Sequence, residues 1–122
     1  MRVVFLDQST LPTPLLPFSF EHQLETYAQT SPEQVISRIA DADIVLTNKV
    51  ILQKHHLDAA PKLKIIGVPA VGLDHVDQKR CATRNIQIFN AAGYASEGVA
   101  EHALMLMLAL RRKLLELSLI HI

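Results

Sequence analysis

Two short stretches of the sequence place groups that can bind an anion directly after runs of aliphatic residues. Asn48-Lys49 follows one run and offers an amide beside a cation, a pair suited to a carboxylate or another polar ligand. Val71-Gly72 follows another run, and a glycine there lets backbone N–H groups approach a ligand closely. On residue types alone, a solvated loop at the first stretch and a plain strand-to-helix turn capped by Asp74 at the second remain alternatives.

The other chemically versatile residues form no recognisable catalytic or metal-binding pattern. The six histidines lack zinc-like spacing, and Glu101 and His102 are adjacent on an expected helix, where neighbours do not face each other. We therefore expect no metal site and interpret the histidines as packed or capping residues. No G-x-G-x-x-G occurs among the four glycines, so the sequence carries no dinucleotide-binding fingerprint. Cys81 lies in an expected helix and is interpreted as a core residue.

Composition restricts the class of protein and of partner. The chain has 122 residues, 49% of them hydrophobic, which suits one domain with a sizeable core. Lys+Arg and Asp+Glu number 12 each, and the absence of net charge argues against a nucleic-acid partner. A single cysteine and no recognisable leader favour a cytoplasmic location. The apolar run 103–110 is too short to span a bilayer, so no membrane partner is expected.

Short strand-like runs alternate with amphipathic segments along the chain. We expect strands at 2–6, 24–28, 43–47, 64–68 and 86–89, helices from 32, at 53–59 and at 75–84, and a proline-rich loop at 11–17. Ser31 and Asp74 are the expected N-caps, and Asn85 is the expected stop of the third helix. This alternation predicts an α/β fold, a flavodoxin-like doubly wound parallel sheet of about five strands. Ligands bind outside the carboxyl ends of the strands in such sheets.

A long helix is expected from Ser96, and every residue from 103 to 110 is apolar. A helix that is apolar all round is buried on all sides, whereas a surface helix shows one apolar stripe. Few elements of so short a chain are left to cover it. The helix is therefore expected to pack between two domains or two subunits.

The segment 42–113 resembles the first half of a D-isomer-specific 2-hydroxyacid dehydrogenase. The matching pieces are ADIVLTNKV, LKIIGVPAVGLDHVD and RCATRNIQIFNAAGYASEGVAEHALMLMLALRR. The start of the chain, with Asp7 and its proline-rich loop, is similar to the glycerate dehydrogenase (hydroxypyruvate reductase) branch of that family.

The resemblance implies a two-domain homodimeric enzyme that transfers a hydride between NAD or NADP and a small 2-hydroxy or 2-keto acid. Residues 1–115 would be the amino-terminal part of its substrate domain, and the inserted NAD-binding domain would be absent. Residues 116–122 match nothing in the family, which suggests a truncated or out-of-frame end. The family's catalytic Arg, Glu and His would lie beyond the chain, so no catalytic residue is assigned and the isolated chain is expected to be inactive.

The resemblance also assigns ligand-binding roles to individual positions. Substrate-binding positions would be Asn48, Lys49, Val71, Gly72 and Tyr94, and the position facing the nicotinamide would be Val99. The backbone of Val71 and Gly72 would bind the substrate carboxylate. A non-catalytic flavodoxin-like module for binding or dimerisation is the alternative, because it explains the missing cofactor motif without truncation. A phosphoacceptor domain is set aside, because Asp7 is the only acid at the end of the first strand.

Overall fold

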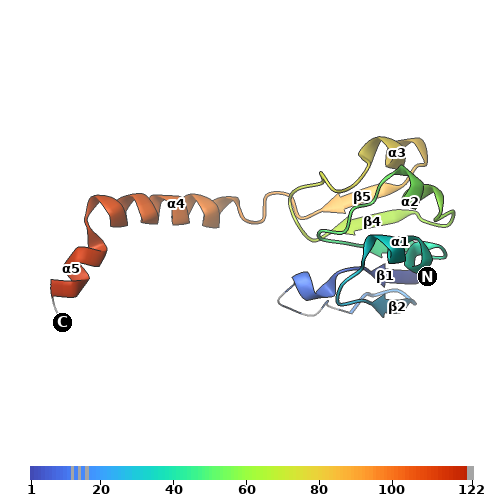
Figure 1. Cartoon of the computed structure of the whole chain (residues 1–122), viewed down its shortest axis with the longest axis horizontal. Helices are drawn as coiled ribbons and strands as arrows, with labels where there is room; N and C mark the ends of the chain where they lie inside the picture. Colours follow the sequence, from blue (N-terminus) through green and yellow to red (C-terminus); the bar gives the residue numbers. More distant parts are fainter. Residues whose placement is uncertain (12, 14, 16, 121–122) are drawn as a thin grey trace. The chain divides into compact units, whose positions relative to one another are not determined.

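The structure of the chain is a computed structural model that describes residues 1–11, 13, 15 and 17–120 (Figure 1). The chain divides into two compact units, Met1–Ala92 and Gly93–Ile122. The first unit contains the sheet, and the second contains two helices. Part of the expected proline-rich loop falls on residues 12, 14 and 16, which lie outside the described residues.

Within the described residues, five parallel strands form a sheet in the order β2-β1-β3-β4-β5. The strands are β1 (Arg2–Phe5), β2 (Gln23–Thr26), β3 (Ile44–Leu46), β4 (Ile65–Val68) and β5 (Gln87–Asn90). This order confirms the predicted flavodoxin-like fold. The chain first adds β2 on one side of β1 and then builds from β3 to β5 on the other side. The direction of winding therefore reverses between β1 and β3, the point where such sheets bind ligands.

Three helices connect successive parallel strands from β2 onward. They are α1 (Pro32–Ile39), α2 (Lys54–Asp58) and α3 (Gln78–Thr83), and a short 3-10 helix, η1 (Gln8–Thr10), follows β1. Right-handed crossovers that all advance in one direction place these helices on the same face of the sheet. The strand register aligns a row of apolar side chains across the sheet, and these belong to the core with residues of the helices. The row is Val4, Val45, Ile66 and Ile88, and the helix residues are Val35, Ile39, Leu57 and Cys81.

The beginning of α1 and the end of α3 agree with the sequence prediction. The N–H of Ser31 donates to Oε1 of Gln34 at 3.2 Å, one half of a capping box, and proline occupies the first helical position. Asn85 adopts the left-handed conformation after α3, with φ of 55°.

The guanidinium of Arg84 donates to the carbonyl of Ala60 at 2.9 Å. This bond places a cation beside the carboxyl-terminal end of α2, where the helix dipole favours positive charge.

The predicted start of α3 is wrong. Asp77, and not Asp74, caps the helix, and its carboxylate accepts the N–H of Arg80 at 2.9 Å. The backbone before it pairs with the segment that precedes α2, because Leu52 donates to the carbonyl of His75 at 2.8 Å and accepts from Asp77 at 2.9 Å. These bonds fix a β-bridge where a helix beginning at 75 would need its first turn.

The second unit contains α4 (Ser96–Arg111) and α5 (Leu114–Ile120). The long helix begins at the predicted serine, but none of its residues is buried. Leu104, Met107 and Leu110 are 58%, 66% and 77% exposed. The sequence predicts that α4 is buried, but the second unit by itself does not cover the helix. Within the described residues, no helix is long and apolar enough to cross a bilayer.

Stability of the first unit depends on pH through His56 of α2. This side chain is 7% exposed, and its Nδ1 accepts the N–H of Gln53 at 3.1 Å. Burial lowers the pKa of His56 below its ordinary value, and the neighbouring His55 lowers it further. The unfolded chain therefore binds this proton more readily than the folded chain. The stability that neutral His56 contributes is present above the unfolded value of 6.5 and is lost as the pH falls below it.

We predict that His56→Gln reduces the decline in the free energy of unfolding between about pH 7 and about pH 5. Glutamine does not titrate and is a favoured residue at the third position of a capping box, so it preserves the bond to Gln53. Denaturant unfolding at each pH measures the effect. The exposed His55, changed to Gln, is the matched control and keeps most of the wild-type pH dependence. An unchanged slope in His56→Gln contradicts the assignment.

Candidate functional site

The predicted substrate positions of the first unit lie on loops that leave neighbouring strands. Asn48-Lys49 follows β3 and Val71-Gly72 follows β4, and these strands are adjacent in the parallel sheet. Both loops therefore leave the same edge of the sheet next to each other, together with the segment that follows β5. The structure thus brings the two stretches predicted to bind substrate to one edge.

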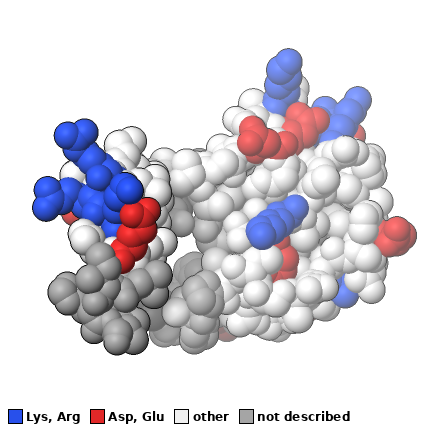
Figure 2. All heavy atoms as spheres, turned by 60° about the vertical axis from the view of Figure 1, so that its left-hand side comes forward, with Lys and Arg blue, Asp and Glu red and all other residues white. Residues whose placement is uncertain are grey.

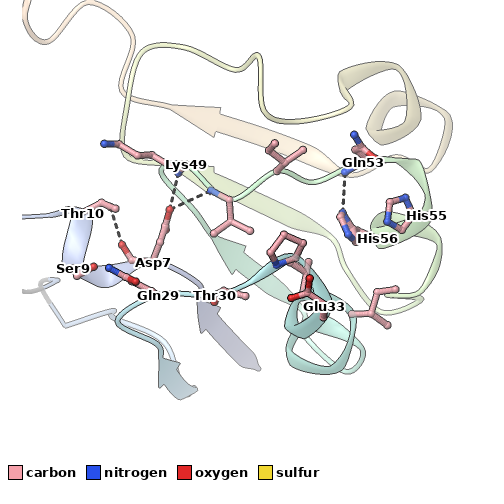
Figure 3. A pocket seen from close by; sticks show the side chains of 15 residues that line it. Asp7, Ser9, Thr10, Gln29, Thr30, Glu33, Lys49, Gln53, His55 and His56 are labelled. Carbon is pink, nitrogen blue, oxygen red and sulfur yellow. Dashed lines mark hydrogen bonds between the residues drawn. The ribbon is translucent and has the colours of Figure 1, made fainter.

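The loop after β3 is organised around the buried carboxylate of Asp7 (Figure 3). Its Oδ1 accepts the N–H of Asn48 at 2.9 Å, and its Oδ2 accepts the N–H groups of Lys49 at 2.6 Å and Val50 at 3.3 Å. The hydroxyl of Thr47, which is fully buried, accepts a further bond from the N–H of Val50 at 3.0 Å. The backbone donors of this loop are therefore engaged within the protein.

The side chains of Asn48 and Lys49, in contrast, reach the surface of the protein. Lys49 is exposed, and its side chain extends away from Asp7 (Figure 3). Asn48 is half-buried. Sequence reasoning assigned no role in the site to Asp7, and the available signal was a lone acid directly after the first buried strand.

The loop after β4 has the opposite arrangement, because its backbone donors are free. The carbonyl of Val71 accepts the side-chain amide of Asn90 at 2.7 Å, and the N–H of Ala91 donates to the carbonyl of Ala70 at 3.0 Å. These bonds tie the loop to the end of β5. Among the described residues, the N–H groups of Val71 and Gly72 find no acceptor. Two adjacent free N–H groups on an exposed loop are suited to a carboxylate.

The fold of the first unit does not itself require glycine at position 72. The backbone there is not left-handed, and an added Cβ would meet only the Asp74 carboxylate, at an ordinary distance of 3.7 Å. Gly67 of β4 differs, because a Cβ there would lie 2.6 Å from Cδ2 of Leu46. A close approach from outside the chain therefore explains Gly72 better than packing within the chain.

The two remaining predicted positions share one hollow in the second unit. It has a volume of about 520 Å³ and is lined by Tyr94, Gly98, Val99, His102 and residues of the next turn of α4. Tyr94 and Val99 are 74% and 65% exposed. Their expected contacts with substrate and nicotinamide stay predictions.

A larger cavity of about 800 Å³ opens between the end of β1, the start of α1 and the segment that leads into α2 (Figure 3). It includes Asp7, Lys49 and His56 but neither Val71 nor Gly72. The cavity of about 800 Å³ and the free N–H groups of Val71 and Gly72 thus indicate different places for a ligand site. The donors decide the assignment of a carboxylate site, because an anion removed from water needs partners that replace its hydration.

The charge distribution adds no competing site on the visible face. Lys and Arg are interspersed with Asp and Glu over the first unit in Figure 2, without a continuous basic patch. In the second unit basic residues gather at 111–113, and Lys113 pairs with Glu116 at 3.1 Å. Within the part of the chain that the structure describes, no three His, Cys, Asp or Glu residues are grouped to hold a metal ion.

We predict that Gly72→Ala changes the free energy of unfolding by less than about 0.5 kcal/mol, because the added methyl group meets only the Asp74 carboxylate, at an ordinary contact distance of 3.7 Å. Gly67→Ala is the contrasting variant and lowers stability, because Leu46 must move to admit the methyl group. Urea unfolding of both variants measures the difference. A large loss of stability in Gly72→Ala would show that the fold requires this glycine.

The chain is similar to known proteins over most of its length. The family described as D-isomer specific 2-hydroxyacid dehydrogenase, catalytic domain, matches residues 3–114. A Haemophilus influenzae protein, provisionally named a 2-hydroxyacid dehydrogenase, is 41% identical over 116 residues, which are 93% of this chain and 37% of that protein. The glycerate dehydrogenase of Methylorubrum extorquens is 38% identical over 112 residues, 91% of this chain and 36% of that enzyme. The chain thus spans little more than a third of these relatives.

A solved structure extends the comparison to three dimensions. The D-lactate dehydrogenase of Aquifex aeolicus, complexed with NAD and lactic acid, superposes with a TM-score of 0.67 at 27% identity. The match covers 88% of this chain and 33% of that enzyme. The parallel sheet, the order of its loops and the match over residues 3–114 lead to one conclusion: the chain belongs to the catalytic-domain family of the D-isomer specific 2-hydroxyacid dehydrogenases.

Proposed function

We propose that residues 1–115 are the amino-terminal part of the substrate-binding domain of an NAD(P)-dependent D-2-hydroxyacid dehydrogenase of the glycerate dehydrogenase (hydroxypyruvate reductase) type. The observation that carries the proposal is the pair of unengaged N–H groups at Val71 and Gly72. Membership of the family and the relatives named glycerate dehydrogenase and hydroxypyruvate reductase support the substrate class. The incomplete cover of those relatives supports a chain that continues into a nucleotide-binding domain.

In this function the chain binds and orients a small 2-hydroxy or 2-keto acid. The substrate carboxylate accepts hydrogen bonds from the N–H groups of Val71 and Gly72, while the cation of Lys49 and the amide of Asn48 approach from the neighbouring loop. These contacts hold C2 of the substrate at a fixed distance from the carboxyl edge. Orientation of this kind lowers the entropic part of the barrier to the reaction.

The residues of α4 fit one end of the implied cofactor. Val99 offers an exposed apolar side chain, and a Cβ added at Gly98 would meet nothing within 4 Å, so the hollow has room for a flat ring. When bound, the nicotinamide accepts or supplies the hydride at C2. The sequence has no glycine-rich fingerprint for the phosphates, so we assign that contact to the further domain.

We also propose that the full-length protein is a cytoplasmic homodimer in which α4 is covered. The support is the extent of apolar surface on this helix, which is a liability for aggregation when left uncovered. A module that only binds or dimerises would need the same cover. Turnover by the full-length protein separates the two functions, since only the dehydrogenase oxidises NADH with hydroxypyruvate.

Titration of the 122-residue chain with hydroxypyruvate, followed by amide NMR shifts, tests the substrate site. We expect saturable shifts at Val71 and Gly72, and no such shifts with glycerol, which lacks the carboxylate. Lys49→Ala weakens binding roughly tenfold through loss of a charge-assisted bond, and Gly72→Ala abolishes it by blocking the approach. Lys62→Ala, which removes a distant exposed cation, is the matched control. Unchanged amides at Val71 and Gly72 contradict the proposed site.

Turnover by the isolated chain tests the proposed division of labour. We predict no oxidation of NADH with hydroxypyruvate above a control without protein, because the residues assigned to cofactor phosphates and to proton transfer lie outside this chain. Absorbance at the NADH band measures the rate. Oxidation that scales with the concentration of the purified chain would refute the assignment of these groups to a further domain.

A further inference from the structure

The three N–H groups of Asn48, Lys49 and Val50 converge on one point at the end of β3. Successive backbone N–H groups that point into one concavity form a nest, a structure that binds anions in many proteins. Here the anion is part of the chain, because the Asp7 carboxylate accepts all three bonds at 2.6 to 3.3 Å. Asp7 is 3% exposed, so solvent anions do not reach this nest.

The neighbouring loop contrasts with this nest. The N–H groups of Val71 and Gly72 have no acceptor among the described residues, and both residues are exposed. Two loops at one edge of the sheet therefore carry adjacent backbone donors, but only the loop after β4 offers them to a ligand. The difference between the loops is the presence of Asp7.

We propose that Asp7 is a positioning and specificity residue that fills the nest after β3, so that a ligand carboxylate binds only at Val71 and Gly72. Its carboxylate holds the 47–50 loop in the conformation that presents the side chains of Asn48 and Lys49 in place of their backbone. The assignment of the ligand rests on the proposed function. Occupancy of the nest by an anion does not rest on it and is tested separately.

Removal of the Asp7 side chain vacates a space shaped for a small carboxylate. Asp7→Ala is expected to have a lower Tm than the wild type, and formate is expected to raise it saturably by about 4 °C or more. The amides of residues 48–50 shift during the same NMR titration. Acetamide, which is neutral, and chloride at equal ionic strength do not reproduce either effect. In the wild type the formate-dependent shifts at residues 48–50 are much smaller than in Asp7→Ala, because Asp7 occupies the nest.

A matched variant separates this role from ordinary structural support. Asp43 also accepts a backbone bond, from the N–H of Arg2 at 2.9 Å, but among the described residues it accepts no second or third N–H of a nest. Asp43→Ala is expected to lose stability without rescue by formate. Asp7→Asn fills the space and so is also not rescued. If Asp7→Ala does not fold alone, its refolding yield with and without formate is the measurement, and formate must raise it.

Failure of the inference is distinguishable from failure of the proposed function. The anion nest is overturned if formate changes neither the Tm of Asp7→Ala nor the amide shifts of its residues 48–50. This result does not depend on how the wild type responds to hydroxypyruvate. In Asp7→Ala, hydroxypyruvate is expected to shift the amides of residues 48–50 as well as those of Val71 and Gly72. A wild-type chain that ignores hydroxypyruvate counts against the proposed function alone.

Discussion

A carboxylate buried at the point where the sheet reverses its winding holds the ligand-facing edge of this chain in shape. β1 and β3 are neighbours, and the N–H of Leu6 extends their ladder by donating to the carbonyl of Leu46 at 3.0 Å. Directly beyond this bond the pairing of the two strands ends, and with it their ladder of backbone hydrogen bonds. A buried N–H without an acceptor costs about 1–3 kcal/mol, so the turn after β3 needs acceptors there. Asp7 supplies them from the diverging strand.

The backbone N–H groups at this edge of the sheet therefore fall into two sets. Donors that follow β3 are engaged by Asp7, whereas the N–H groups of Val71 and Gly72 after β4 have no acceptor among the described residues. Asn90 makes this division possible, because its amide fixes the carbonyl of Val71 without engaging any N–H group of that loop. The loop after β4 is thus tied to the end of β5, while the N–H groups of Val71 and Gly72 have no acceptor among the described residues, an arrangement that would favour preorganised binding at the proposed site.

Features encoded locally were readable from the sequence, and features that depend on distant segments were not. Ser31 and Asn85 act through bonds or backbone conformations within a few residues, so their types revealed their places. The cap of α3 was misplaced because Leu52, some twenty-five residues earlier in the chain, holds the intervening backbone in a bridge. The partners of Asp7 lie 41 to 43 positions away, and no spacing rule connects them.

The candidate site shows the same division. Residue types and resemblance selected Asn48-Lys49 and Val71-Gly72, and the sheet brought these stretches to one edge. Which of their backbone groups are free depended on Asp7 and Asn90, and only coordinates reveal such bonds.

The apolar surface of α4 has a consequence for how much of the helix a partner would have to cover. Leu104, Met107 and Leu110 are exposed, and the residues between them are apolar too, so no single face of the helix is preferred for docking. A partner that covers one side of α4 leaves a comparable apolar area on its other sides. A partner that covered one side alone would therefore leave exposed apolar surface on the helix, which favours aggregation.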